Sequence, residues 1–167
     1  MTAFAVTAAA PEDAAAIAAF NVAIAAETED LALDPAVVRA GVDALLADPA
    51  KGRYFLARTA GGRNGDEGGG GSGELAGQLM VTTEWSDWRN GDWWWVQSVY
   101  VAPAHRRRGA FGALLDHAAA AAGAAGAVGL RLYVERDNAP ARAAYARRGF
   151  AETAYRLYER PRSAAGG

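Results

Sequence analysis

Cysteine is absent from this chain of 167 residues. Its absence excludes a disulfide framework and a thiol nucleophile, and it fits a reducing compartment, so we expect a cytoplasmic protein. Long apolar runs are absent too, because the alanine-rich stretch 118–125 is far shorter than the ~18 residues of a membrane span. The opening segment has no basic region and carries Glu12 and Asp13, so we expect neither a signal peptide nor a membrane partner.

Excess positive charge is also missing, since 17 Lys and Arg face 19 Asp and Glu, for a net charge of −2. Nucleic-acid-binding domains are usually strongly basic, so we expect no nucleic-acid partner. The two histidines, His105 and His117, stand apart from other metal ligands and predict no metal site. With 51% hydrophobic residues, the chain is expected to form one domain over residues 1–160. Residues 60–73 are predicted to be a flexible glycine-rich loop, and residues 161–167 a disordered tail.

Hydrophobic spacing along the chain predicts alternating strands and helices. Strands are expected at 3–8, 53–59, 74–83, 93–101, 129–136 and about 151–159. Helices are expected at 11–26, 35–48, from 111 onward and after 138. The pattern predicts an α/β (α+β) fold with a mixed, mostly antiparallel sheet of about six to seven strands, flanked by helices.

A basic, glycine-containing turn follows the strand expected at 93–101. Pro103 ends that strand, and the arginine run 106–108 precedes Gly109 and Gly112. Free N–H groups at the start of the next helix favour a phosphate, and the arginines add forked donors. The turn is not a P-loop, which needs Lys-Ser or Lys-Thr after its last glycine, and it has too few glycines for a dinucleotide fingerprint. A merely solvated arginine-rich helix start is the alternative.

A second motif lies in residues 129–150, GLRLYVERDNAPARAAYARRGF. Apolar and polar residues alternate in its first half, as in a half-buried strand. Asp137 or Asn138 can cap the following helix, Pro140 sits in its first turn, and Gly149 ends it.

Both motifs resemble those of the GNAT acetyltransferase superfamily. Arg-x-x-Gly from Arg106 to Gly109, after a V-x-P strand end, is similar to the family's pyrophosphate loop. The spacing of Asn138, Ala141, Tyr145 and Gly149-Phe150 looks like its second motif, N-x-x-A-x-x-x-Y-x-x-x-G-F. The resemblance covers about residues 94–150. It implies that the fourth and fifth strands splay apart to admit acetyl-CoA.

The resemblance also implies which residues meet the cofactor. The strand end at 99–101 would run beside the pantetheine arm, and the turn would surround the pyrophosphate. Phe111 departs from the Gly or Ala usual in the family, and its ring has an alternative place in the core beside Leu114 and Leu115. Asn138 is either a plain helix cap or a cap that also meets the pantetheine. The implied cofactor-binding residues are Val99, Tyr100, Val101, Arg106, Arg107, Arg108, Gly109, Ala110, Phe111, Gly112 and Asn138.

Tyr145 is the predicted catalytic acid. A tyrosine with a pKa near ~10 stays protonated at neutral pH and can protonate a leaving thiolate; the alternative is a helix tyrosine packed on the sheet. The family's usual base position is occupied by Tyr133. Glu84 and Glu135 are the candidates for a base, and each has the alternative of being a surface carboxylate.

An acceptor pocket is predicted from acidic and aromatic residues. Glu27 and Glu29 are expected between the first two helices, and Trp85 and Trp88 crowd the neighbouring strand pair. Carboxylates with aromatic walls suit a cationic amine. The alternatives are a solvated acidic loop and tryptophans in the core or at the interface of a homodimer.

The sequence therefore predicts an acetyl-CoA-dependent N-acetyltransferase that acts on a primary amine of a small molecule or peptide by direct attack. A hydroxyl acceptor would need a stronger base than any in view. A non-catalytic acyl-CoA-binding or regulatory module is the alternative from another class.

Overall fold

The structure, a computed structural model, describes residues 4–60 and 73–160. The glycine-rich segment expected to be flexible lies almost wholly outside the described residues, as does the expected tail at 161–167. The chain forms two compact units, Met1–Tyr133 and Val134–Gly167.

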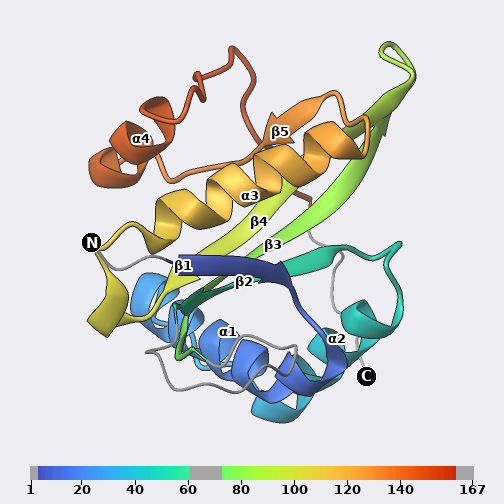
Figure 1. The fold of residues 1–167 in the computed structure, drawn as a ribbon. Coiled ribbons are helices and arrows are strands. Elements are labelled where there is room, and N and C mark those ends of the chain that lie inside the picture. The colour runs from blue at the N-terminus through green and yellow to red at the C-terminus, as the bar shows by residue number, and fades with distance from the viewer. Residues whose placement is uncertain (1–3, 61–72, 161–167) are drawn as a thin grey trace. The chain divides into compact units, whose positions relative to one another are not determined.

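The first unit is built on a mixed sheet with strands in the order β1-β2-β3-β4-β5 (Figure 1). Its pairs are antiparallel except for β4 with β5, which is parallel. The strands are β1 (Phe4–Ala8), β2 (Arg53–Thr59), β3 (Leu75–Ser86), β4 (Gly91–Val101) and β5 (Gly129–Arg131). This confirms the α/β class and the mixed, mostly antiparallel sheet.

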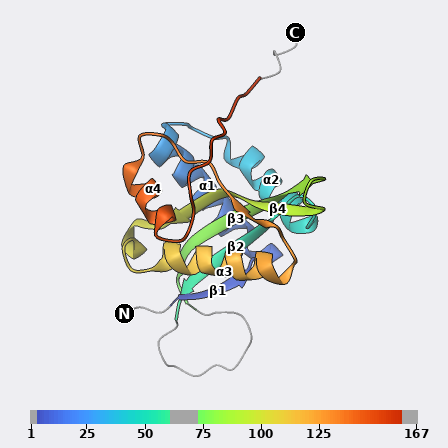
Figure 2. The ribbon, with the colours of Figure 1, turned by 90° about the horizontal axis from the view of Figure 1, so that it is seen from above.

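Helices cover both faces of this sheet (Figure 2). One face carries α1 (Ala14–Glu29), which follows the short helix η1 (Pro11–Asp13), and α2 (Pro35–Ala47). The other face carries α3 (Ala110–Ala124), which follows the short helix η2 (Pro103–His105). Asp34 caps α2, because its carboxylate accepts a hydrogen bond from the N–H of Ala36 at 2.8 Å.

Two apolar layers hold the helices to the sheet. Beneath α1 and α2, Ile17 and Leu56 are fully buried, and Val42 and Leu45 pack with them. On the other face, Leu114 and Leu115 of α3 are buried. Full burial of such a side chain contributes roughly 1.5–3 kcal/mol to the free energy of unfolding.

Several expected elements differ from the structure. Helix α1 runs on to Glu29 and ends where Asp30 takes a left-handed φ of 51°, so Glu27 and Glu29 are helical and do not lie between helices. β5 stops at Arg131 and does not reach residue 136, because its ladder with β4 ends at the pair Trp95–Arg131. The strand expected at 151–159 is wrong: within the described part of the second unit these residues are exposed and have no ladder partner, which a strand needs for stability. The sheet accordingly has five strands in the described residues and not six to seven.

The second unit contains α4 (Ala139–Ala146). Asn138 caps it by accepting a hydrogen bond from the N–H of Ala141 at 3.1 Å. At the other end Gly149 has a φ of 83°, a conformation that glycine adopts readily.

Candidate active site

The end of β4 has an open edge in the first unit. Beyond Trp95, β5 no longer pairs with β4, whereas β3 pairs with it as far as Val101. The N–H of Ala102 donates to the carbonyl of Ala76 on β3 at 2.9 Å. Because backbone groups alternate along an antiparallel strand, those of Val99 and Val101 point away from β3, toward the open edge. A ligand carrying amide groups can pair with this edge as an added strand would.

The turn between η2 and α3 has two residues in left-handed conformations. Arg107 has a φ of 61° and Gly109 a φ of 100°. A Cβ atom added at Gly109 would meet nothing within 4 Å, so the backbone conformation and not crowding requires glycine here.

Helix α3 begins without a side-chain cap. Gly109, its N-cap residue, offers no side chain to accept from the first-turn amides. Ala110 and Gly112 are buried small residues on the first turn of α3. The first-turn N–H groups of a helix and its dipole favour an anion at this position, and the exposed Arg107 and Arg108 add positive charge. The half-buried Phe111 lies on the same turn.

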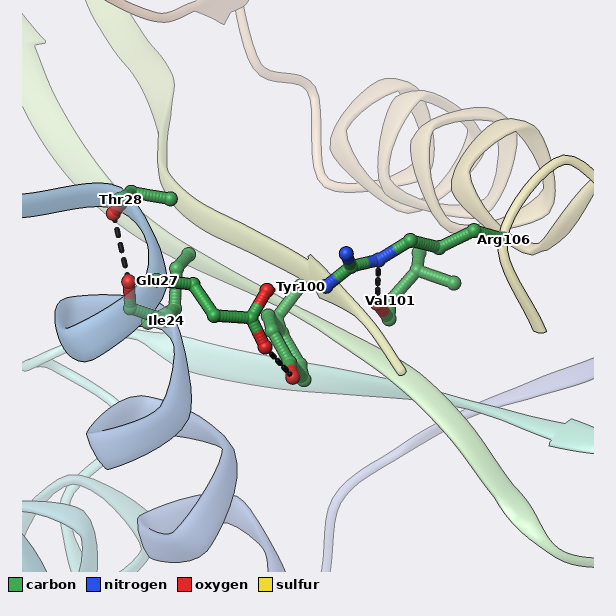
Figure 3. Close-up of polar contacts among 6 residues, drawn as sticks. All are labelled: Ile24, Glu27, Thr28, Tyr100, Val101 and Arg106. Atoms are coloured by element: carbon green, nitrogen blue, oxygen red, sulfur yellow. Dashed lines mark hydrogen bonds and ion pairs between the residues drawn. The ribbon is translucent and has the colours of Figure 1, made fainter. Parts of the chain in front are cut away.

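Arg106 reaches back from this turn toward β4 and α1 (Figure 3). Its Nε donates to the carbonyl of Val101 at 2.9 Å, and a terminal nitrogen lies 2.5 Å from a carboxylate oxygen of Glu27. The other oxygen of Glu27 accepts from the Tyr100 hydroxyl at 2.7 Å. We call Glu27, Tyr100 and Arg106 the latch cluster. Glu27, which was expected at the acceptor, is therefore in direct contact with Tyr100 and Arg106, which were expected at the cofactor.

The latch cluster is charged at neutral pH. The hydrogen bond from Tyr100 and then that from Arg106 lower the pKa of Glu27 from its ordinary value, so its carboxylate is ionised. Burial, followed by the hydrogen bond to Glu27, raises the pKa of Tyr100, which stays neutral. Both bonds to Glu27 are thus charge-assisted, which makes them stronger than neutral ones.

Glu84 belongs to a separate cluster near the hairpin of β3 and β4. One of its oxygens accepts from Arg131 at 2.7 Å and the other from the indole N–H of Trp95. The guanidinium of Arg131 lies 4.1 Å from the ring centroid of Trp93, so the chain's own arginine makes the cation–π contact there. Trp93 is opposite Glu84 and roughly 20 Å along β4 from Tyr100, so Glu84 and Glu27 serve different places.

The other predicted aromatic residues divide between core and surface. Trp94 is buried and stacks on Phe55 with ring centroids 6.5 Å apart. Trp85 and Trp88, at the end of the hairpin, are 61% and 91% exposed. These two remain available to a ligand or a partner.

Gln97 and Thr82, near the point where β4 and β5 diverge, were not predicted as site residues. The hydroxyl of Tyr133 donates to Gln97 at 3.4 Å, and the amide of Gln97 donates to Thr82 at 2.7 Å. Gln97 sits in a β-bulge, since Met80 pairs with Ser98 and Val81 with Val96. This contact could not be predicted from the sequence, because it depends on the pairing register of β3 and β4, which local sequence patterns do not specify.

In the second unit, Tyr145 packs edge-on against Phe150, with ring centroids 5.6 Å apart. The N–H of Phe150 donates to the carbonyl of Tyr145 at 3.2 Å, which explains the spacing of tyrosine and Gly-Phe. Burial raises the pKa of Tyr145, so its hydroxyl holds its proton at neutral pH. Glu135 is exposed, and its backbone carbonyl accepts a hydrogen bond from the N–H of Asn138 at 3.1 Å.

Comparison with known proteins decides the family. The model of the acetyltransferase (GNAT) family matches residues 47–150. A crystal structure of a possible acetyltransferase from Clostridium difficile 630 is 37% identical, with a TM-score of 0.82 over 95% of this chain and 97% of that one. This chain belongs to the GNAT acetyltransferase family.

More distant structures share the GNAT fold. A ribosomal-protein-alanine N-acetyltransferase from Brucella melitensis biovar Abortus 2308 is 20% identical, with a TM-score of 0.70 over 95% of this chain and 99% of that one. An aminoglycoside N-acetyltransferase in complex with CoA is 12% identical, with a TM-score of 0.74 over 97% of each chain. A search of the curated proteins gives no match.

The GNAT chain is therefore an acyltransferase that uses acetyl-CoA. The residues present fit this cosubstrate: the edge of Val99 and Val101 suits the amides of pantetheine, and the uncapped start of α3 suits phosphate. Within residues 4–60 and 73–160, no group of three or more side chains is arranged to hold a metal ion. In the same ranges, no helix is long and apolar enough to cross a membrane.

Proposed function

We propose that this GNAT protein is an N-acetyltransferase that moves the acetyl group of acetyl-CoA to a primary amine of a small molecule or peptide. The observation that carries the proposal is the open edge of β4 running directly into the uncapped turn at Gly109. The turn residues Arg107 to Gly112 hold the pyrophosphate, and Val99 to Val101 hold the pantetheine arm. Asn138 meets the pantetheine in addition to capping α4.

The reaction is a direct attack. The neutral amine nitrogen forms a bond to the thioester carbonyl carbon, the carbon–sulfur bond breaks, and CoA leaves with the electron pair. Tyr145 gives its proton to that sulfur, and the raised pKa of its hydroxyl keeps the proton available. The amine loses one proton, which restores the acid, so the products are an amide and the CoA thiol.

The amine's proton leaves through water or a carboxylate. Glu84 and Glu135 are the proposed carboxylates. Glu135 is exposed, whereas both oxygens of Glu84 already accept hydrogen bonds. On these contacts we favour Glu135 over Glu84.

A screen of acceptors tests the proposal. Release of CoA thiol from acetyl-CoA is measured with amino acids, polyamines, aminoglycosides and peptides with free N-termini. We expect one amine class to raise thiol release well above the rate without acceptor. Tight CoA binding with no turnover on any amine would instead indicate a non-catalytic acyl-CoA-binding module.

The exposed tryptophans of the hairpin are proposed to border the acceptor. Glu29 follows Glu27 at the end of α1, toward the other end of β4, so it is proposed to contact a different part of an extended acceptor. Replacing Trp85 and Trp88 together by alanine is expected to raise KM for the acceptor about three- to ten-fold, because aromatic contact area is lost. KM for acetyl-CoA should not change. Steady-state kinetics measure both, and Tyr155→Ala, which removes an exposed aromatic residue of the second unit, is the control.

The same pair of tryptophans can also be tested as a contact between two copies of the chain. If sedimentation velocity shows a dimer that the double variant loses, while KM for the acceptor is unchanged, the tryptophans belong to a homodimer interface and not to the acceptor site.

A further inference from the structure

The carboxylate of Glu27 links the last turn of α1 to the end of β4 and to the turn between η2 and α3 (Figure 3). We call this turn, residues 106–109, the cofactor turn. Its two oxygens accept from the Tyr100 hydroxyl at 2.7 Å and from Arg106 at 2.5 Å. Tyr100 is buried and also contacts Phe20 of α1, with ring centroids 4.9 Å apart. The Glu27 side chain is therefore held by Tyr100 at one oxygen and by Arg106 at the other.

Arg106 is the first residue of the cofactor turn, and its side chain ties the turn to β4 and α1. Its guanidinium binds Val101 through Nε and Glu27 through a terminal nitrogen, and it lies 5.7 Å from the ring centroid of Tyr100. These contacts direct the guanidinium toward β4 and α1 and not toward the start of α3 (Figure 3). The next residue, Arg107, has a left-handed φ of 61°. The contacts of Arg106 therefore hold the chain at the point where it changes direction.

We propose that Glu27 is a positioning residue for the cosubstrate: through Arg106 it fixes the turn that binds the CoA pyrophosphate. This inference rests on the proposed function. Glu27 itself touches no part of CoA and acts by holding the arginine. Helix α1 and the cofactor turn are coupled through this ion pair, so loss of the Glu27 charge weakens CoA binding.

The direction of the effect follows from preorganisation. A turn already held in its bound shape loses less conformational freedom when CoA binds, so releasing it lowers affinity. Glutamine at position 27 can still accept from Tyr100 through its amide oxygen, but it loses the charge that holds Arg106. Because the pair is partly exposed, the expected rise in Kd for CoA is about three- to five-fold.

The test measures CoA binding by calorimetry in a double-mutant cycle of Glu27→Gln and Arg106→Gln. Each single variant should raise Kd, and the double variant should bind no more weakly than Arg106→Gln alone, because both changes break one interaction. Asp43→Asn is the matched control, since it removes an exposed carboxylate–arginine pair with Arg39 on α2. It should leave Kd unchanged.

Kinetics separate this role from a direct contact with the acceptor. Glu27→Gln should raise KM for acetyl-CoA and leave KM for the amine and kcat nearly unchanged. A higher KM for the amine with an unchanged Kd for CoA would overturn the proposal and place Glu27 at the acceptor. Equal CoA affinity of Glu27→Gln and the unmodified protein, or fully additive losses in the cycle, would also overturn it. If the unmodified protein itself fails to bind CoA, the proposed function fails instead.

Discussion

Replacing Tyr145 by phenylalanine is expected to lower kcat by about 10²-fold or more while leaving the Kd for CoA unchanged. The substitution removes only the hydroxyl, so the ring still packs edge-on against Phe150. Without that hydroxyl, the departing CoA sulfur has lost its proposed proton donor. Steady-state kinetics with the best acceptor, together with calorimetry for CoA, measure the two effects separately.

The pH profile gives an independent test of the same residue. Burial raises the pKa of Tyr145 above its ordinary value of 10.0, so the hydroxyl is half-ionised only above that pH. Any fall in kcat caused by ionisation of Tyr145 should thus have its midpoint above pH 10 and be missing in the phenylalanine variant. Tyr158→Phe, at an exposed tyrosine of the same unit, is the control. An unchanged kcat in Tyr145→Phe would return this residue to a packing role.

Replacing Gly109 by valine is expected to abolish measurable CoA binding in a protein that remains folded. The φ of 100° at Gly109 is strained for a β-branched residue, so the turn would rearrange at the N-terminus of α3. The new side chain would also project into the open space beside the amides that are proposed to hold the pyrophosphate. The fold should survive because Leu114 and Leu115 keep α3 buried against the sheet. Calorimetry measures binding, and circular dichroism confirms folding.

The opposite end of α3 supplies a matched control for this change. Gly126 also has a positive φ, of 72°, and a Cβ atom there would also meet nothing within 4 Å. Gly126→Val therefore imposes similar backbone strain far from the cofactor turn, and it should keep CoA affinity. Undiminished affinity in folded Gly109→Val would remove the turn from the cofactor site. Equal losses in both variants would attribute the effect to general strain.

Several features of this protein were predictable because they depend on residues close together in the sequence. Asp34 and Asn138 cap their helices by bonding amides two and three residues onward. Gly109 and Gly149 supply the positive φ values at which α3 begins and α4 gives way to Phe150. A short apolar run predicted β2 at its observed bounds, because a strand inside a sheet that is covered on both faces buries most of its side chains.

The ends of elements were less predictable because they depend on distant partners. β5 reads as a long strand by its alternation, yet it stops where β4 diverges and the ladder ends. Residues 151–159 carry aromatic residues suited to a strand, but their pattern says nothing about whether a ladder partner is present. The local sequence pattern likewise did not predict that α1 continues to Glu29.

The sequence by itself determined the strand–turn–helix that suits phosphate, the capped helix that carries Tyr145, and the class of fold. These depend on backbone preferences and hydrophobic spacing within about twenty residues, which the order of amino acids expresses directly. Only the tertiary structure decided which donors Glu27 and Glu84 accept from. Arg106 and Arg131 reach them across the sheet from distant parts of the chain. An exposed carboxylate has no local signal for its partner, because the pairing is set by which strands and helices the whole fold brings together.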